Sequence, residues 1–186
     1  IVGFTRMSNI LQSSRIAELL NEYLAEMTRA IFANGGTVDK FVGDAVMAIY
    51  GSPEELTPEE QVRRAVASAQ AMLEALDRLN GRWQSMKLIG DNGVPPVRFR
   101  CGIHQGTAVV GMFGSPERSD YTAIGPSVNI AARLEEAAQP NTILVSATVA
   151  QYLDSRMVKE YGFLKLKGMD EDILGFVVSR SPISED

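Results

Sequence analysis

The spacing of apolar residues predicts two long amphipathic helices in the first half of the chain. The segment SSRIAELLNEYLAEMTRAIFANGG, residues 13–36, has apolar side chains three and four positions apart. Its closing Gly-Gly pair ends the helix. A second helix opens with Thr57 as N-cap, Pro58 at the first helical position and Glu60 at the third, the pattern of a capping box.

Short apolar runs predict the first strands. VDKFV and AVMAIYG are joined at Gly43-Asp44, which is typical of a tight hairpin. The opening IVGFT resembles a strand cut off partway, so we expect the natural chain to extend upstream. VRFRCGI alternates like a strand and follows a Gly- and Pro-rich segment at 90–96, which we expect to be a surface loop. The order so far is β-α-β-β-α-β, the ferredoxin-like split pattern.

The second half of the chain adds further elements to this core. We expect a helix at VNIAARLEEAA, a short helix from Ser146, and strands at TAVVGMF, TILVS, FLKLKG and ILGFVVS. The pattern therefore predicts an α/β (α+β) fold, with a ferredoxin-like βαββαβ core and a C-terminal α/β extension. With no internal repeat and no second-domain boundary, residues 1–186 are expected to form a single domain, in which 179–186 is a flexible tail.

Composition narrows the possible partners. The 186 residues are 45% hydrophobic, enough for one core. A net charge of −5 argues against non-specific nucleic-acid binding, which needs a basic surface. The single cysteine, Cys101, rules out an intrachain disulfide and fits a small hydrophobe in a strand. No apolar run approaches the roughly 20 residues of a membrane span, and no signal peptide is evident, so we expect a cytoplasmic domain.

Two segments near the predicted first strand and hairpin are candidates for binding chemistry. Asp44 fits simple turn chemistry, but a carboxylate at a strand end is also a plausible ligand for a hard cation. Gly3, Phe4 and Thr5 lie where a strand leads into a helical region, and backbone N–H groups in such a turn can bind phosphates. An ordinary turn is the simpler interpretation of this second segment.

Further candidates lie on the predicted helix at VNIAARLEEAA and around it. Asn129 and Arg133 are four residues apart and share a helix face. They form either a solvated polar pair or an amide and a guanidinium aimed at one ligand, since arginine suits a phosphoryl group. Lys40, within a strand, and Thr122, just before the helix, could together read the edge of a base. A snorkelling lysine is the alternative.

Two remaining polar residues favour structural roles. In FLKLKG, Lys165 and Lys167 share one strand face, which indicates an exposed surface. His104, the only histidine, lies at the tight turn GIHQG without an evident acid or histidine partner. We expect it to pack in that turn rather than act in catalysis.

Longer motifs resemble a known family. IVGFTRMS, GTVDKFVGDAVMAIYG, RFRCGIHQGTAVVGMFG and DYTAIGPSVNIAARLEE resemble, in order and over nearly the whole chain, the catalytic domain of class III adenylyl/guanylyl cyclases. The similarity is greatest to soluble cyanobacterial adenylyl cyclases, a branch related to the bicarbonate-responsive mammalian enzyme. The resemblance implies upstream regulatory domains, and activation by bicarbonate is an expectation for the branch.

The resemblance assigns one group of residues to metal and phosphate binding. The family holds two divalent ions, Mg²⁺ with Mn²⁺ as a substitute, by two aspartates. One matches Asp44, and the other is expected immediately upstream of Ile1, whose backbone carbonyl joins the metal shell. Gly3, Phe4 and Thr5 match the loop whose amides bind the β- and γ-phosphates.

It assigns a second group to the nucleoside and the reacting phosphate. Lys40 and Thr122 match the pair that selects the purine, and Asn129 matches the asparagine that orients the ribose. Arg133 matches the arginine on the reacting phosphate, and Lys167 the lysine on the triphosphate tail. In this family the two groups meet only between two chains of a head-to-tail homodimer.

The implied reaction converts ATP to 3′,5′-cyclic AMP and pyrophosphate by in-line attack of the ribose 3′-hydroxyl on the α-phosphorus, with two metals. Lys40 favours adenine, because an ammonium only donates and adenine N1 accepts, whereas guanine N1 carries a proton. A threonine hydroxyl both donates and accepts, so Thr122 by itself discriminates weakly. Guanylyl cyclase activity and a catalytically inactive nucleotide-binding module are the alternatives. VGDAVMA lacks the acidic hairpin motif of diguanylate cyclases.

Overall fold

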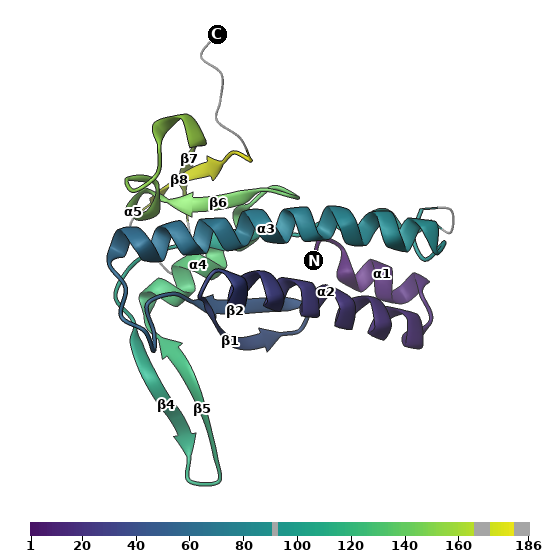
Figure 1. Ribbon diagram of the computed structural model, residues 1–186, viewed down its shortest axis with the longest axis horizontal. Coiled ribbons are helices and arrows are strands. Elements are labelled where there is room, and N and C mark those ends of the chain that lie inside the picture. Colours follow the sequence, from purple (N-terminus) through teal and green to yellow (C-terminus); the bar gives the residue numbers. More distant parts are fainter. Residues whose placement is uncertain (91–92, 166–171, 181–186) are drawn as a thin grey trace.

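Helices and strands follow one another mostly as the apolar pattern predicts (Figure 1). The computed structural model describes residues 1–90, 93–165 and 172–180. The helices are α1 Phe4–Ile10, α2 Ser13–Ala33, α3 Pro58–Ser85, α4 Pro126–Ala137 and α5 Ala147–Ala150, with a 3₁₀ turn, η1, at Ser155–Met157. The strands are β1 Thr37–Val42, β2 Ala45–Ile49, β3 Cys101–Ile103, β4 Val109–Ser115, β5 Arg118–Ile124, β6 Ile143–Ser146, β7 Val158–Leu164 and β8 Ile173–Val178.

The long helices α2 and α3 pack against each other and bury their apolar stripes, as predicted. Trp83 of α3 is fully buried and donates a hydrogen bond to Glu22 of α2 at 2.6 Å. Half of the predicted capping box forms, because the Thr57 hydroxyl accepts the Glu60 amide at 3.3 Å. The Glu60 carboxylate binds two arginines further along α3 instead of returning to the cap.

The largest sheet has the strand order β3-β6-β8-β7, and β6 is buried on both faces. Ile143 and Val145 of β6 belong to the core that contains α2 and α3, whereas Leu144 packs with Ile130 and Leu134 of α4. Alternation along the strand explains this division, since successive side chains point to opposite faces. The hairpins β1–β2 and β4–β5 form two separate two-stranded sheets.

The predicted strand at Ile1–Thr5 is wrong, because α1 already begins at Phe4. The Val2 amide donates to the Arg98 carbonyl at 2.7 Å, a single contact that does not make a ladder. The strand predicted at VRFRCGI is shorter than expected and starts at Cys101. Two backbone amides ahead of it are bound by asparagine side chains rather than by a neighbouring strand.

The sequence interpretation omitted β5, which pairs antiparallel with β4 to make an arm that projects from the body (Figure 1). The expected surface loop at 90–96 is only partly correct, since Val94 is fully buried and residues 91–92 lie outside the description. In the expected tail, the Ser179 amide donates to the Met157 carbonyl and Arg180 pairs with Asp77. Residues 181–186 lie outside the description.

Candidate active site

The β1–β2 turn brings Asp44 to Ile1. Gly43 has a left-handed φ of 62°, which favours glycine and lets the chain reverse tightly. The Asp44 carboxylate, 26% exposed, lies 2.7 Å from the Ile1 nitrogen. Among the described residues, no three or more histidine, cysteine or acidic side chains are placed so that they could hold a metal ion. Asp44 is therefore a lone, accessible carboxylate beside the Ile1 backbone, a donor set that suits part of a hard-cation shell.

Gly3, Phe4 and Thr5 lie at the start of α1. Gly3 is the N-cap residue with a left-handed φ of 72°, and Phe4 and Thr5 open the helix. No side chain caps this helix, so its first amides have no side-chain partner at the cap. Together with Asp44 and Ile1, this segment forms what we call the turn group.

A second group gathers on β1 and β5, where Asp39 connects Lys40 to Thr122. The Thr122 hydroxyl donates to Asp39 Oδ2 at 2.7 Å, and the Ala123 amide donates to the same oxygen at 3.4 Å. The Lys40 ammonium lies 3.8 Å from Asp39 Oδ1. The structure thus places the predicted base-reading pair, Lys40 and Thr122, around one carboxylate.

Asp39 was missed by sequence reasoning. In a regular strand its side chain and that of Lys40 would point to opposite faces. The β1–β2 register shifts between Val38 and Lys40, which leaves Asp39 as the extra residue of a bulge. An acid next to a lysine within an apolar run was the available signal, but sequence alone does not locate a bulge.

Helix α4 places Asn129 beside this second group. Asn129 lines a shallow hollow with residues of the β5–α4 junction, which are Ala123, Ile124, Gly125, Pro126 and Val128. Arg133 lies one turn later, 38% exposed, and its guanidinium binds Glu136 at 2.6 Å. A Cβ on Gly102 would lie 2.3 Å from the backbone of α4, so a glycine in β3 lets the helix sit this close. We call Lys40, Asp39, Thr122, Asn129 and Arg133 the base group.

The two groups occupy different parts of the β1–β2 hairpin, because Asp44 lies at its turn whereas Asp39 and Lys40 lie within β1. The hairpin turn lies by the N-terminus and α1, whereas β5 joins α4 near the opposite end (Figure 1). Lys167 lies outside the described residues, so its predicted position stays untested. Within the described part of one chain, the predicted residues therefore lie in two separate groups.

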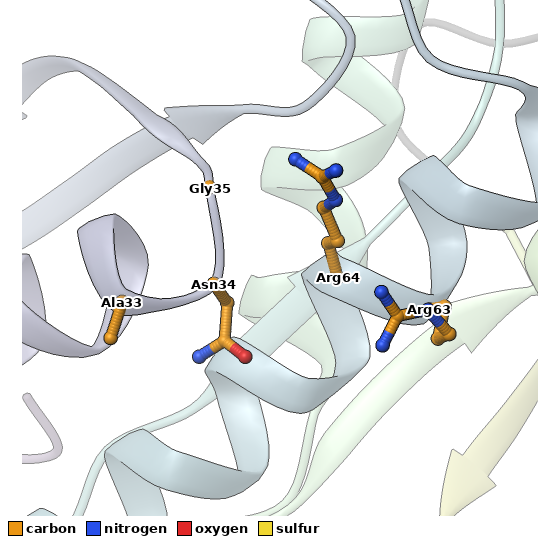
Figure 2. Close-up of a pocket in the computed structure, with 5 residues that line it drawn as sticks. All are labelled: Ala33, Asn34, Gly35, Arg63 and Arg64. Carbon is orange, nitrogen blue, oxygen red and sulfur yellow. The ribbon is translucent and has the colours of Figure 1, made fainter.

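Another hollow lies away from both groups. Ala33, Asn34 and Gly35 at the end of α2 face Arg63 and Arg64 of α3 (Figure 2). Both arginines bind Glu60, and Arg64 also binds Glu54. The negative charges of these two glutamates balance the positive charges of the two arginines. The hollow therefore offers no excess charge to a ligand.

His104 and Cys101 have the structural roles expected of them. His104 Nδ1 lies 2.9 Å from the Ser146 hydroxyl, and burial lowers the pKa of the imidazole. Burial, followed by the charge of Glu135, raises the pKa of the Cys101 thiol to about 12. A thiol with so high a pKa is unreactive near neutral pH.

Comparison with known proteins identifies the family. The model of the adenylate and guanylate cyclase catalytic domain matches residues 1–179, and the chain belongs to this family. An adenylate cyclase of Anabaena cylindrica is 35% identical, over 93% of this chain and 34% of that protein. Adenylate cyclase 1 of Rhizobium meliloti is 34% identical, over 90% of this chain and 24% of that protein. The chain thus spans about a third or less of these relatives.

Solved structures confirm the predicted fold class. The adenylyl cyclase CyaB from P. aeruginosa matches with a TM-score of 0.89 at 35% identity, covering 97% of this chain and 90% of that one. The guanylyl cyclase Cya2 matches with a TM-score of 0.85 at 29% identity, covering 100% and 89%. The resemblance to class III cyclases is therefore confirmed. In the described residues, none of the helices has the length and apolar character needed to cross a bilayer.

Proposed function

We propose that the chain is the catalytic domain of an adenylyl cyclase, which converts ATP to 3′,5′-cyclic AMP and pyrophosphate. The observation that supports it best is the placement of Lys40 and Thr122 around Asp39, next to the hollow at Asn129. The ammonium of Lys40 can only donate, which matches the acceptor N1 of adenine and opposes the N1 proton of guanine. Adenine is therefore the base that this cluster fits.

Helix α4 supplies the groups for the ribose and the reacting phosphate. In this proposal the Asn129 amide orients the ribose, and the Arg133 guanidinium stabilises charge that develops on the α-phosphoryl group. The ion pair of Arg133 with Glu136 is partly exposed at both side chains. Exposed pairs are worth about 0–1 kcal/mol, so exchanging Glu136 for a phosphate costs little.

The turn group would bind metal and the triphosphate. Asp44 and the Ile1 carbonyl supply oxygen ligands, with a second aspartate upstream of Ile1, and Mg²⁺ or Mn²⁺ suits such ligands. Two divalent ions held there would supply charge that neutralises the triphosphate and would lower the pKa of the ribose 3′-hydroxyl. The amides of Gly3, Phe4 and Thr5 would bind the β- and γ-phosphates, and Lys167 the triphosphate tail.

A complete site would form between two chains in a head-to-tail homodimer. Two observations support this proposal: the turn and base groups lie on different parts of the hairpin, and apolar side chains are exposed nearby. On the arm Val109, Met112 and Ile124 are exposed, as are Phe41 and Val42 at the end of β1. In this proposal the second chain covers these side chains and removes them from water. The two-fold symmetry of such a dimer creates two equivalent sites.

Other aspects of the proposal concern the whole protein. ATP as substrate favours a cytoplasmic location, and the lengths of the relatives favour additional regulatory domains in the natural chain. Activation by bicarbonate stays a prediction.

The direct test measures product formation from ATP and from GTP, each with Mg²⁺ and with Mn²⁺, on a form of the protein that includes the residue before Ile1. We expect cyclic AMP from ATP and a much lower rate with GTP. A preference for GTP would favour guanylyl cyclase activity, an alternative that is consistent with the similarity to the guanylyl cyclase Cya2. Nucleotide binding without turnover would favour the inactive module.

A further inference from the structure

The Asp39 carboxylate fixes the direction of its hydrogen bond with Thr122. Its side chain is fully buried, and Oδ2 accepts the Ala123 amide at 3.4 Å, so this oxygen acts as an acceptor. The Thr122 hydroxyl, 2.7 Å from the same oxygen, must therefore be the donor. A hydrogen bond to an ionised acceptor is about twice as strong as a neutral one. The other acceptor within reach, the Ala123 carbonyl, is 3.5 Å away and competes poorly.

This direction determines what Thr122 can offer to a ligand. A hydroxyl has one proton and two lone pairs, and here the proton is committed to Asp39. Only lone pairs remain, so a base contacting Thr122 must donate a hydrogen bond to it. The side chain is 6% exposed, which leaves the hydroxyl little freedom to turn away from its partner.

Asp39 also acts on Lys40. Its Oδ1 is buried without a hydrogen-bond partner among the described residues, and the Lys40 ammonium lies 3.8 Å away. That distance is an ion pair rather than a hydrogen bond, so the negative charge attracts the ammonium while its protons stay available. A donor on Lys40 thus lies beside an acceptor on Thr122.

This pattern distinguishes the 6-amino purines from the 6-oxo purines. Adenine offers a donor at its 6-amino group and an acceptor at N1. Hypoxanthine and guanine offer the reverse, an acceptor at O6 and a donor at N1. A threonine hydroxyl whose proton is free could also donate a hydrogen bond to O6. Thr122 would then discriminate poorly between a 6-amino and a 6-oxo group.

We propose that Asp39 is a specificity-determining positioning residue, which holds the Thr122 proton and thereby makes the hydroxyl an acceptor for the 6-amino group of adenine. This inference rests on the proposed adenylyl cyclase function and specifies how its base is chosen. Asp39 itself need not touch the nucleotide.

The test compares ATP with ITP, which lacks the 2-amino group of guanine and differs from ATP only at the 6-position and N1. The variants are Asp39→Asn, Thr122→Val and the double variant, with Asp77→Asn as the matched control for loss of an acid in an exposed ion pair. The full-length protein is used for kcat/KM and for nucleotide Kd. Thermal unfolding establishes that each variant is folded.

We expect Asp39→Asn to lower the ATP-to-ITP ratio about tenfold, the value of one ordinary hydrogen bond. The amide of the variant can donate to Thr122 and so release its proton toward O6. Thr122→Val should lower the ratio similarly, and adding Asp39→Asn to it should change the ratio no further. Asp77→Asn should leave the ratio at the wild-type value.

Two results would overturn the inference. An equal loss with both nucleotides in Asp39→Asn would mean a structural role only. The same fall in the ratio in the Thr122→Val background would mean that Asp39 acts without Thr122. A wild-type protein that makes no cyclic AMP would instead refute the proposed function, and the ratio of Kd values would still test Asp39.

Discussion

Two aspartates on one hairpin, Asp39 and Asp44, have opposite environments. Asp39 has a fully buried side chain, and its carboxylate accepts hydrogen bonds from Thr122 and Ala123. Asp44 is 26% exposed at the turn, where it lies beside the Ile1 backbone. Both are acids within a short stretch of apolar sequence, yet one is enclosed by donors and the other is open.

The difference separates two kinds of chemistry. A buried carboxylate whose partners are already bound is suited to holding other groups in position, since leaving it unpaired is costly. An open carboxylate with little competition is suited to binding a cation from solution. One short hairpin thus connects the base group to the turn group. Substitutions in the two groups should therefore differ in their effects on activity and on stability.

A large loss of kcat is expected from Arg133→Ala in the base group. Loss of a donor that acts on developing charge typically lowers kcat by about 10²–10³, with little change in KM. Steady-state kinetics with ATP measures both constants. Arg63→Ala, which removes another exposed, paired arginine, is the matched control. An effect on KM alone would make Arg133 a binding residue.

Lys40→Glu should lower kcat/KM for ATP about tenfold to hundredfold, because an acceptor would then face the N1 acceptor of adenine. The substitution also places a second carboxylate next to Asp39. Use of GTP need not appear, since Thr122 is unchanged. Lys159→Glu, on the exposed part of β7, controls for the change of charge. Parental turnover of ATP in Lys40→Glu would show that Lys40 does not read the base.

The two aspartates should differ in their effect on stability. Asp39→Ala leaves the Thr122 hydroxyl and the Ala123 amide without their acceptor, which should cost about 1–3 kcal/mol. Asp44→Ala removes a partly exposed carboxylate that holds no buried group in place, so it should change stability little, yet it should abolish activity. Urea unfolding and the activity assay measure the two effects. Equal destabilisation by both changes would remove the distinction between a buried positioning group and an open ligand.

The smallest effect is the contribution of His104, which lies outside both groups, to the pH dependence of folding stability. Burial lowers its pKa from the ordinary 6.5, so the folded chain binds a proton less readily than the unfolded chain. Stability from His104 is therefore complete above pH 6.5 and is lost as the pH falls toward the lowered pKa. Thermal unfolding at pH 7.5 and 5.5 should show this loss, and His104→Gln should reduce it. An identical loss in the variant would assign it to other groups.

Most long elements were predictable from sequence because their signals are local. The stripe of α2, the cap and proline of α3 and the Gly43-Asp44 turn follow from spacing and residue type. The strand β5 was not predicted, because the arm is largely exposed and lacks a clean apolar alternation. The segment IVGFT was misassigned, since apolar residues alone do not distinguish a strand from the lead into α1.

The candidate site was predictable only in part. Ile1 with Asp44, and Lys40 with Thr122, were named from motifs, and the structure brings each pair together. Asp39 was not named, because its side chain is placed by a shift in the β1–β2 register. The two-residue alternation of a strand sequence does not reveal where such a shift occurs.

We propose that the turn group of one chain and the base group of another form one site. The most direct test mixes two inactive variants, Asp44→Ala and Arg133→Ala, in a form that includes the residue before Ile1. In a two-fold dimer, one site of each mixed pair collects both defects and the other collects none. Equal mixing with free exchange makes about half of the dimers mixed, so activity should return to roughly a quarter of wild type. No activity, with chain exchange verified separately, would contradict both the shared site and the division of roles between Asp44 and Arg133.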